Sequence, residues 1–307
     1  MTDEQNRLTV RAPAPEWFNW AIGQQGQSAR VMVDSCSIHY LVWQPEDGVT
    51  DPGGLLFVHG GGAHAHWWCH IAPFFRAGYR VAALDLSGMG DSGMRSEYNA
   101  TLRAEEIQAV IDDAGLGRRT FLVGHSFGGF MSMRHASLYG DNLAGMVIAD
   151  SPLYPPDQDD SRRRRANPMG AIRLYPDFEE AVARFRLRPR QPCDNDFIVE
   201  YIARHSVKEV DGGWSWKFDP NAMAGRRFAE PFHTHLKAAN CRAALFIAAN
   251  SALVTLKMAQ YTNSLMGPKA PLVIIPAAHH HLMLDQPLAF VAALRTQLAG
   301  WQREDGY

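Results

Sequence analysis

The pentapeptide Gly124-His125-Ser126-Phe127-Gly128 lies between two runs of different character. The apolar run Thr120 to Val123 before it predicts a strand, and the run Phe130 to Tyr139 after it predicts a helix. A serine at a sharp strand-to-helix turn has its hydroxyl held above the edge of the sheet, and flanking glycines remove side chains that would collide there. We therefore predict that Ser126 is a nucleophile that attacks a carbonyl carbon.

A serine hydroxyl is a poor nucleophile at neutral pH, so it needs a base within hydrogen-bond reach and a third group that orients the base. The last predicted strand, Leu272 to Ile275, leads to His279-His280-His281, and a histidine in this loop can lie over the serine. Three adjacent histidines also suggest a metal site. Consecutive side chains point in different directions, however, and no cysteine or carboxylate stands at ligand spacing, so we expect no metal.

Attack on a carbonyl also needs N–H donors for the negative charge that develops on the oxygen. The predicted strand Leu55 to Val58 leads into His59-Gly60-Gly61-Gly62, where small residues let backbone amides approach a ligand closely. We predict that the amides of Gly61 and Phe127 form an oxyanion hole.

The elements that must position these groups follow an alternating order. With 307 residues and 46% hydrophobic content, the chain can bury the core of one large domain. The runs Ser28 to Val33 and Ser37 to Trp43 predict an antiparallel hairpin. Short apolar runs that alternate with helical segments then predict buried parallel strands covered by helices on both faces, which is an α/β fold. These runs are Leu55–Val58, Val81–Leu86, Thr120–Val123, Met146–Ala149, Ala244–Ala248 and Leu272–Ile275.

The alternation is interrupted between Ser151 and about Leu236, where no strand is apparent and several helix signals occur. We therefore predict a helical cap over 151–236, inserted into a core formed by 16–150 and 237–307, with a flexible segment over 1–15. Within the cap, Asp177 is expected to begin a helix. Trp214 and Trp216 could line a substrate cavity, although packing of the cap is the more common role for such residues.

The composition limits the partners and the compartment. A net charge of −2 offers no broad attraction to nucleic acid, and no apolar run is long enough to span a membrane. The residues Met1 to Pro15 are unlike a signal peptide, and the four cysteines lack metal-ligand spacing. We expect a cytoplasmic protein with reduced thiols. The run Arg162 to Arg165 is expected to be solvated.

Four motifs follow one another along the chain: a strand that leads into HGGG, the stretch Asp85 to Ser92, GHSFG and a late histidine. In this the chain resembles an α/β-hydrolase fold enzyme over roughly residues 28 to 300. The resemblance implies a mostly parallel central sheet with a helical cap. In related sequences the catalytic histidine stands seven positions before a proline that matches Pro287, which implies His280. His279 and His281 are then flanking residues, and Asp85 to Ser92 form a structural turn.

The acid that would orient the histidine is harder to identify from the sequence than the nucleophile or the base. Similar enzymes usually carry this acid in the loop after the strand matched by Ala244 to Ala248, but residues 249–254 contain no carboxylate. In some of them the acid follows the preceding strand, where this chain has Asp150. The resemblance therefore implies Asp150 as the orienting acid. Asp285 follows His280 too closely to orient its ring.

The resulting hypothesis is a serine esterase or lactonase that acts through an acyl-enzyme on a small to medium apolar molecule, without a cofactor. A homo-oligomer is compatible with the sequence. A serine at this position argues against epoxide hydrolase chemistry, in which similar proteins use aspartate. Two alternatives remain open. One is hydrolysis of a carbon–carbon bond beside a ketone by the same residues, and the other is a slow or non-catalytic small-molecule receptor, which the missing carboxylate near Asn250 favours.

Overall fold

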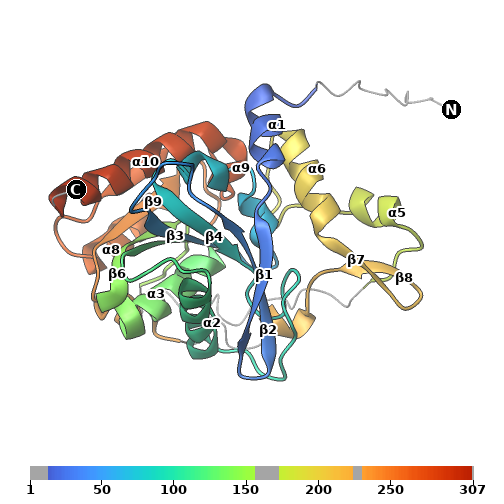
Figure 1. Cartoon of the computed structure of the whole chain (residues 1–307), viewed down its shortest axis with the longest axis horizontal. Coiled ribbons are helices and arrows are strands. Elements are labelled where there is room, and N and C mark those ends of the chain that lie inside the picture. Colours follow the sequence, from blue (N-terminus) through green and yellow to red (C-terminus); the bar gives the residue numbers. More distant parts are fainter. Residues whose placement is uncertain (1–12, 156–172, 224–229, 306–307) are drawn as a thin grey trace.

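The computed structural model describes residues 13–155, 173–223 and 230–305. Our expectations for residues 1–12 and for Arg162 to Arg165 fall outside these ranges. Within them an eight-stranded sheet forms the centre of the molecule, in the order β1-β2-β4-β3-β5-β6-β9-β10 (Figure 1). Its strands are β1 (Gln27–Val33), β2 (Cys36–Trp43), β3 (Gly53–Val58), β4 (Tyr79–Leu84), β5 (Thr120–His125), β6 (Leu143–Ala149), β9 (Ala243–Ala248) and β10 (Leu272–Ile275).

The sheet is mostly parallel. Only the pairs β1–β2 and β2–β4 are antiparallel, and every other neighbouring pair in the sheet is parallel. Alternate side chains of a central strand enter two separate apolar cores: Leu55 and Phe57 pack on one face, and Leu56 and Val58 pack on the other. Burial on both faces explains why the parallel strands are short, continuous apolar runs in the sequence. The strand predictions are therefore confirmed.

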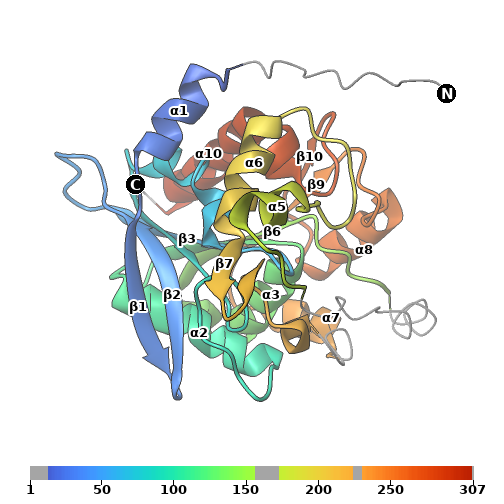
Figure 2. The ribbon, with the colours of Figure 1, turned by 90° about the vertical axis from the view of Figure 1, so that its right-hand side faces the viewer.

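Helices cover both faces of the sheet, as Figures 1 and 2 show. One face carries α2 (Ala100–Asp113), α3 (Phe127–Tyr139), α7 (Phe232–Lys237) and α8 (Leu256–Leu265). The other carries α10 (Pro287–Glu304), preceded by the short α9 (Leu282–Asp285), and the 3₁₀ turns η1 (Ala65–Trp68) and η2 (Ala72–Phe75). A further 3₁₀ turn, η3 (Gly140–Asn142), links α3 to β6. No helix among these described residues combines the length and apolar character that crossing a membrane requires.

The helix α1 (Glu16–Gly23) was not predicted from the sequence. It is only eight residues long and contains five aromatic or aliphatic side chains that do not form a clear long stripe. The ring of Phe18 packs 4.8 Å from that of Phe197, which belongs to the insertion between β6 and β9. Tertiary contact rather than local helix propensity therefore stabilises this short helix.

The insertion between β6 and β9 contains α5 (Phe178–Ala183), α6 (Asp196–His205) and the 3₁₀ turn η5 (Pro220–Met223). The side chain of Asp177 accepts a hydrogen bond from the amide of Glu180, so the predicted start of α5 is confirmed. The expectation of no strand here is wrong, because β7 (Val207–Val210) and β8 (Gly213–Trp216) form an antiparallel hairpin. Four residues with two charges in β7 are too short and polar to appear as an apolar run.

The two tryptophans of β8 hold the insertion together. Trp214 and Trp216 pack against a small apolar cluster formed by Tyr175, Ala181 and Val207. The ring of Trp214 lies 5.0 Å from that of Phe178 in an edge-to-face arrangement. These contacts support the packing role rather than a substrate-lining role.

Candidate active site

Ser126 lies at a strained turn between β5 and α3, with φ 52° and ψ −114°. A positive φ is unfavourable for a residue with a side chain and is found where surrounding contacts enforce it. Here the Ser126 amide donates to the carbonyl of Ala149 at 2.8 Å. The Ser126 carbonyl accepts from the Ser151 hydroxyl at 2.8 Å and from the Gly129 amide at 3.0 Å. The hydroxyl is thereby fixed at the carboxyl edge of the sheet.

The glycines on either side permit close contact between this turn and its neighbours. A Cβ atom on Gly124 would lie 2.6 Å from the carbonyl oxygen of Gly128. A Cβ atom on Gly128 would lie 2.4 Å from the carbonyl oxygen of Val58, at the end of β3. Real Cβ atoms do not approach backbone oxygens so closely, so α3 can begin against β3 only with glycine at these positions.

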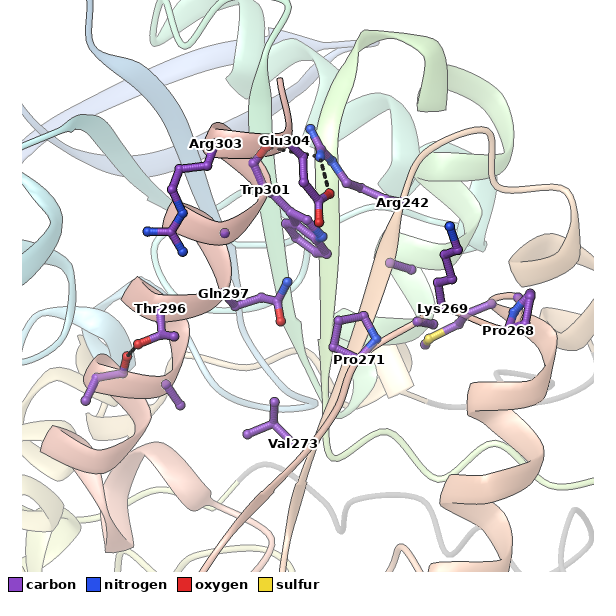
Figure 3. A pocket seen from close by; sticks show the side chains of 17 residues that line it. Arg242, Pro268, Lys269, Pro271, Val273, Thr296, Gln297, Trp301, Arg303 and Glu304 are labelled. Atoms are coloured by element: carbon purple, nitrogen blue, oxygen red, sulfur yellow. Dashed lines mark hydrogen bonds and ion pairs between the residues drawn. The ribbon is translucent and has the colours of Figure 1, made fainter. Parts of the chain in front are cut away.

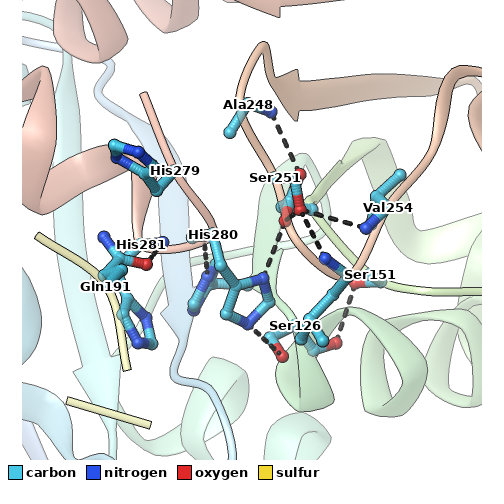
Figure 4. A network of polar contacts seen from close by, with 12 residues as sticks. Ser126, Ser151, Gln191, Ala248, Ser251, Val254, His279, His280 and His281 are labelled. Carbon is cyan, nitrogen blue, oxygen red and sulfur yellow. Dashed lines mark hydrogen bonds and ion pairs between the residues drawn. The ribbon is translucent and has the colours of Figure 1, made fainter. Parts of the chain in front are cut away.

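The structure brings Ser126, His280 and Asp150 together (Figure 4). His280 Nε2 lies 3.0 Å from Ser126 Oγ, and His280 Nδ1 lies 2.7 Å from Asp150 Oδ2. The side chains of His280 and Asp150 are almost completely buried. When Nδ1–H donates to the carboxylate, the lone pair of Nε2 faces the serine hydroxyl and can take its proton. This is the arrangement that acyl transfer requires.

Three donors converge on the Asp150 carboxylate. Besides His280, the amide of Ala248 donates to Oδ1 at 3.0 Å, and the hydroxyl of Ser251 donates to Oδ2 at 2.6 Å. Asp150 itself has φ 49°, a left-handed conformation that aspartate tolerates better than most residues. A buried charge needs such hydrogen bonds to offset its lost hydration. Ser251 stands in the loop where the resemblance placed the acid, and it supports the carboxylate from the next strand.

The backbone around His280 is held on both sides. The His279 amide donates to Asp285 Oδ2 at 2.6 Å. The His281 amide donates to Gln191 Oε1 at 3.0 Å, and Gln191 Nε2 donates to both carboxylate oxygens of Asp285 at 2.9 and 3.0 Å. Gln191 belongs to the insertion, so the insertion and the histidine loop are joined directly. Asp285 accepts from the His279 amide and from the Gln191 side chain, whereas the His280 ring contacts Asp150, so Asp285 does not orient that ring.

His125, the residue before the nucleophile, also positions the histidine loop. Its Nε2–H donates to the His280 carbonyl at 2.9 Å. Burial, together with the neighbouring His280, lowers the pKa of both His125 and His281 well below the usual value. Both rings are therefore neutral at pH 7. No local pattern in the sequence revealed the roles of His125, Gln191 or Ser251.

One ring nitrogen from each of His125, His280 and His281 lies within 4.8 Å of the other two, so this group of histidines is a candidate for metal binding. The hydrogen bonds do not fit a metal site. Both nitrogens of His280 face Ser126 and Asp150, and His125 Nε2 faces a carbonyl oxygen. A metal ion would have to displace these contacts, so the cluster is better described as a base with two neutral neighbours.

Gly61 and Phe127 are adjacent. A Cβ atom on Gly61 would lie 3.6 Å from the Cβ atom of Phe127 and 2.5 Å from Met223 Cε. In the described part of the chain, neither amide donates to a protein acceptor. The Phe127 amide is also at the N-terminus of α3, where the helix dipole favours negative charge. The two residues are therefore neighbours at the start of α3, with Met223 of the insertion beside Gly61, and their role as an oxyanion hole stays a prediction.

His59 fixes the turn that carries Gly61. Its Nδ1–H donates to the Gly60 carbonyl at 2.7 Å, and its Nε2 accepts from the Leu86 amide at 3.0 Å. Burial lowers the pKa of His59, which keeps the ring neutral and able to accept at Nε2. The first residue of the HGGG run is therefore a structural link between β3 and the loop after β4.

A surface cavity of about 940 Å³ lies away from this site, between the beginnings of β9 and β10 and the last turns of α10 (Figure 3). Arg242, Lys269 and Trp301 line it, and Arg242 forms an ion pair with Glu304 at 3.2 Å. Ligands of open α/β sheets bind at the carboxyl ends of the strands, whereas this cavity is at the amino ends. It is not part of the candidate active site.

Residues 55–294 match the model of the alpha/beta hydrolase family, so the chain belongs to this family. Esterase Rv0045c of Mycobacterium tuberculosis is 26% identical over 173 residues, which are 54% of this chain and 56% of that protein. The 2-hydroxy-6-oxononadienedioate/2-hydroxy-6-oxononatrienedioate hydrolase of Burkholderia vietnamiensis is 32% identical over 131 residues, or 39% of this chain and 42% of that protein. The chain thus spans about half the length of these curated relatives.

Solved structures show the same fold. The crystal structure of E-2-(acetamidomethylene)succinate hydrolase superposes with a TM-score of 0.75 at 22% sequence identity, covering 88% of this chain and 98% of that chain. At this level of identity the similarity concerns the fold. The predicted α/β-hydrolase architecture, with a mostly parallel sheet flanked by helices, is confirmed.

Proposed function

We propose that the chain is a serine hydrolase that cleaves a carboxylic ester or lactone of a small to medium apolar molecule. The hydrogen-bonded series Ser126–His280–Asp150 carries this proposal, with contacts of 3.0 and 2.7 Å. A serine without a neighbouring base and acid has no group to take its proton. Relatives named as an esterase and as a hydrolase agree with the reaction class.

In the proposed reaction, Ser126 Oγ attacks the carbonyl carbon while its proton moves to His280 Nε2. The imidazolium that forms is stabilised by Asp150, which also fixes the tautomer. The carbonyl oxygen becomes negative and is met by the amides of Gly61 and Phe127. His280 then protonates the leaving alcohol. Water, activated by the same histidine, releases the acyl group from Ser126.

The surroundings of the serine favour an uncharged acyl group. Phe127 and Met223 are apolar and buried beside Gly61, and His125 is neutral at pH 7. A charged acyl group would lose hydration on entering such surroundings without gaining a partner from these side chains. An apolar acyl group gains free energy from the same burial.

Hydrolysis of a carbon–carbon bond beside a ketone is the second candidate. It uses the same serine, histidine and acid, and the Burkholderia vietnamiensis hydrolase is the observation that favours it. Asp150, whose Oδ2 lies 2.7 Å from His280 Nδ1, supports the catalytic proposal over the receptor alternative, which rested on the carboxylate missing from residues 249–254. Ester hydrolysis remains the proposal because an ester also provides a leaving group that His280 can protonate directly.

Turnover of 4-nitrophenyl butyrate tests the proposal. Wild type should hydrolyse it, and Ser126→Ala should lower kcat by at least about 10⁴-fold. Ser264→Ala is the matched control, because this serine is exposed on α8 and only bonds the carbonyl of Tyr261. Turnover that persists in Ser126→Ala would exclude the assigned nucleophile. Faster turnover of a 2-hydroxy-6-ketodienoate than of any ester would favour carbon–carbon hydrolysis, and binding without turnover would favour a receptor.

A further inference from the structure

A second series of serine, histidine and carboxylate lies outside the candidate active site. The Oγ of Ser28 on β1 is 2.9 Å from Nε2 of His39 on β2. The Nδ1 of His39 is 2.7 Å from Oδ2 of Asp85, just after β4. The same atom types face one another at nearly the same distances as in the series that begins at Ser126.

The hairpin register explains how these groups meet. In the pairing of β1 with β2, Ser28 is opposite Leu41 and Arg30 is opposite His39. Ser28 and His39 are therefore diagonal neighbours on one face of the sheet. His39 is 3% exposed and Asp85 is fully buried, whereas Ser28 is exposed. An exposed serine residue thus has its hydroxyl against a buried histidine, which in turn contacts a buried aspartate.

The hydrogen bonds at Asp85 determine where the protons are. Its Oδ1 accepts from the amide of Ala65 at 2.6 Å, and its Oδ2 accepts from the amide of Asp91 at 2.8 Å. Burial alone would raise the pKa of Asp85, but the hydrogen bond with His39 Nδ1 opposes this effect, and the net shift is downward. The carboxylate therefore accepts the Nδ1–H of His39. Nε2 is left as an acceptor for the Ser28 hydroxyl proton.

A cavity of about 360 Å³ adjoins this hairpin. Leu41, the strand partner of Ser28, lines it together with Tyr201 and two histidines, His66 and His205. The histidine rings are stacked with centroids 4.2 Å apart. Burial lowers the pKa of both, that of His66 to about 4, so neither ring is charged at pH 7. The cavity is within the size range of small-ligand sites and lies beside the hairpin, with these neutral imidazoles in its wall.

We propose that Ser28, His39 and Asp85 form a second covalent site, at which an acyl or phosphonyl group is transferred from an activated electrophile to Ser28 Oγ. With a fluorophosphonate, the Oγ–P bond forms as the P–F bond breaks. The Ser28 proton passes to His39 Nε2 and leaves with fluoride as HF. With an aryl ester, the bond from Oγ to the acyl carbon forms, the bond from the acyl carbon to the phenolic oxygen breaks, and the departing phenolate takes the proton from His39 Nε2.

Ser28 differs from Ser126 in what surrounds the reacting centre. It lies inside a strand, where successive amides point in opposite directions, and not at a helix N-terminus. No pair of converging amides is therefore built beside it to stabilise an oxyanion. Attack of water on the adduct is then slow. Ser28 is a site of lasting modification, distinct from the turnover proposed for Ser126.

The test is labelling of the full chain carrying Ser126→Ala with a biotin-linked alkyl fluorophosphonate, followed by intact mass and peptide mapping. We expect one adduct, on Ser28, formed roughly 10²-fold faster than on Ser35, a nearby exposed serine of the same hairpin. Ser28→Ala in this background should abolish the adduct, and His39→Gln should slow its formation at least tenfold.

Labelling of Ser28 no faster than Ser35 would overturn the proposal, as would a rate unchanged by His39→Gln. If His39→Gln does not fold, the comparison of the two serines in Ser126→Ala alone decides. Labelling of Ser126 in the wild-type chain reports separately on the proposed hydrolase site, so failure of one site is not mistaken for failure of the other.

Discussion

Replacing Asp150 with asparagine reverses the two hydrogen bonds at the Oδ2 position, those with His280 and Ser251, and leaves the size of the side chain nearly unchanged. The Ala248 amide donates to Oδ1 at 3.0 Å, so the amide oxygen of the asparagine is held at that position. Its NH₂ group then occupies the Oδ2 position, 2.7 Å from His280 Nδ1. The ring must accept there and carry its proton on Nε2. It can no longer accept the proton of Ser126.

We expect kcat to fall about 10⁴-fold, the loss that the wrong histidine tautomer causes in a serine protease triad. At about 1.36 kcal/mol for each factor of ten, this corresponds to roughly 5 kcal/mol of transition-state stabilisation. KM should change little, because Asp150 is fully buried behind His280 and does not face the substrate.

The assay is steady-state hydrolysis of 4-nitrophenyl butyrate. Asp34→Asn is the matched control, because Asp34 is exposed, has a similar φ of 44°, and lies in the β1–β2 turn. The pair Asp150→Asn with Ser251→Asp should recover part of kcat, because Ser251 Oγ is 2.6 Å from the carboxylate oxygen that contacts the histidine. A kcat for Asp150→Asn within tenfold of wild type would refute the assignment of the acid.

Gln191→Ala removes the contact between the histidine loop and the insertion, so steady-state kinetics should show kcat about tenfold lower with little change in KM. An unchanged kcat would show that this contact does not position the base. Burial lowers the pKa of His135 to about 3, so below about pH 6.5 only the unfolded chain gains its proton. Wild type should therefore lose about 2 kcal/mol more stability than His135→Gln between pH 7 and 5 in urea unfolding, and equal losses would contradict this. Gly128→Ala should lower the free energy of unfolding by about 3 kcal/mol. Gly78→Ala is the control, because no atom lies within 4 Å of a Cβ placed there, and its free energy of unfolding should stay within about 1 kcal/mol of wild type. Similar losses in the two variants would refute the steric argument.

The sheet and the elbow could be predicted because their signals are local. Strands buried on both faces are short apolar runs, and the turn at Ser126 needs glycines at fixed spacing. The hairpin of β7 and β8 was missed because four-residue strands with polar side chains carry no periodic pattern. The helix α1 was missed because its partner, the ring of Phe197, is distant in sequence.

Within the candidate site, the nucleophile and the glycine turn were visible in the sequence, and the resemblance selected His280 and Asp150. The groups that hold them were not visible. Gln191 and His125 contact the histidine loop across separations of 90 and 155 residues, and such contacts leave no trace in a single sequence. In the sequence, the loop that contains Ser251 is notable only because it lacks a carboxylate. In the structure the Ser251 hydroxyl donates to the Asp150 carboxylate from the neighbouring strand.

The most direct measurement is a crystal structure of the wild-type chain after reaction with a phosphonate ester that mimics a tetrahedral intermediate. We predict a covalent bond to Ser126 Oγ, the phosphonyl oxygen within hydrogen-bond distance of the Gly61 and Phe127 amides, and His280 still bonded to Asp150. An unmodified Ser126, or a phosphonyl oxygen that points away from both amides, would contradict the account.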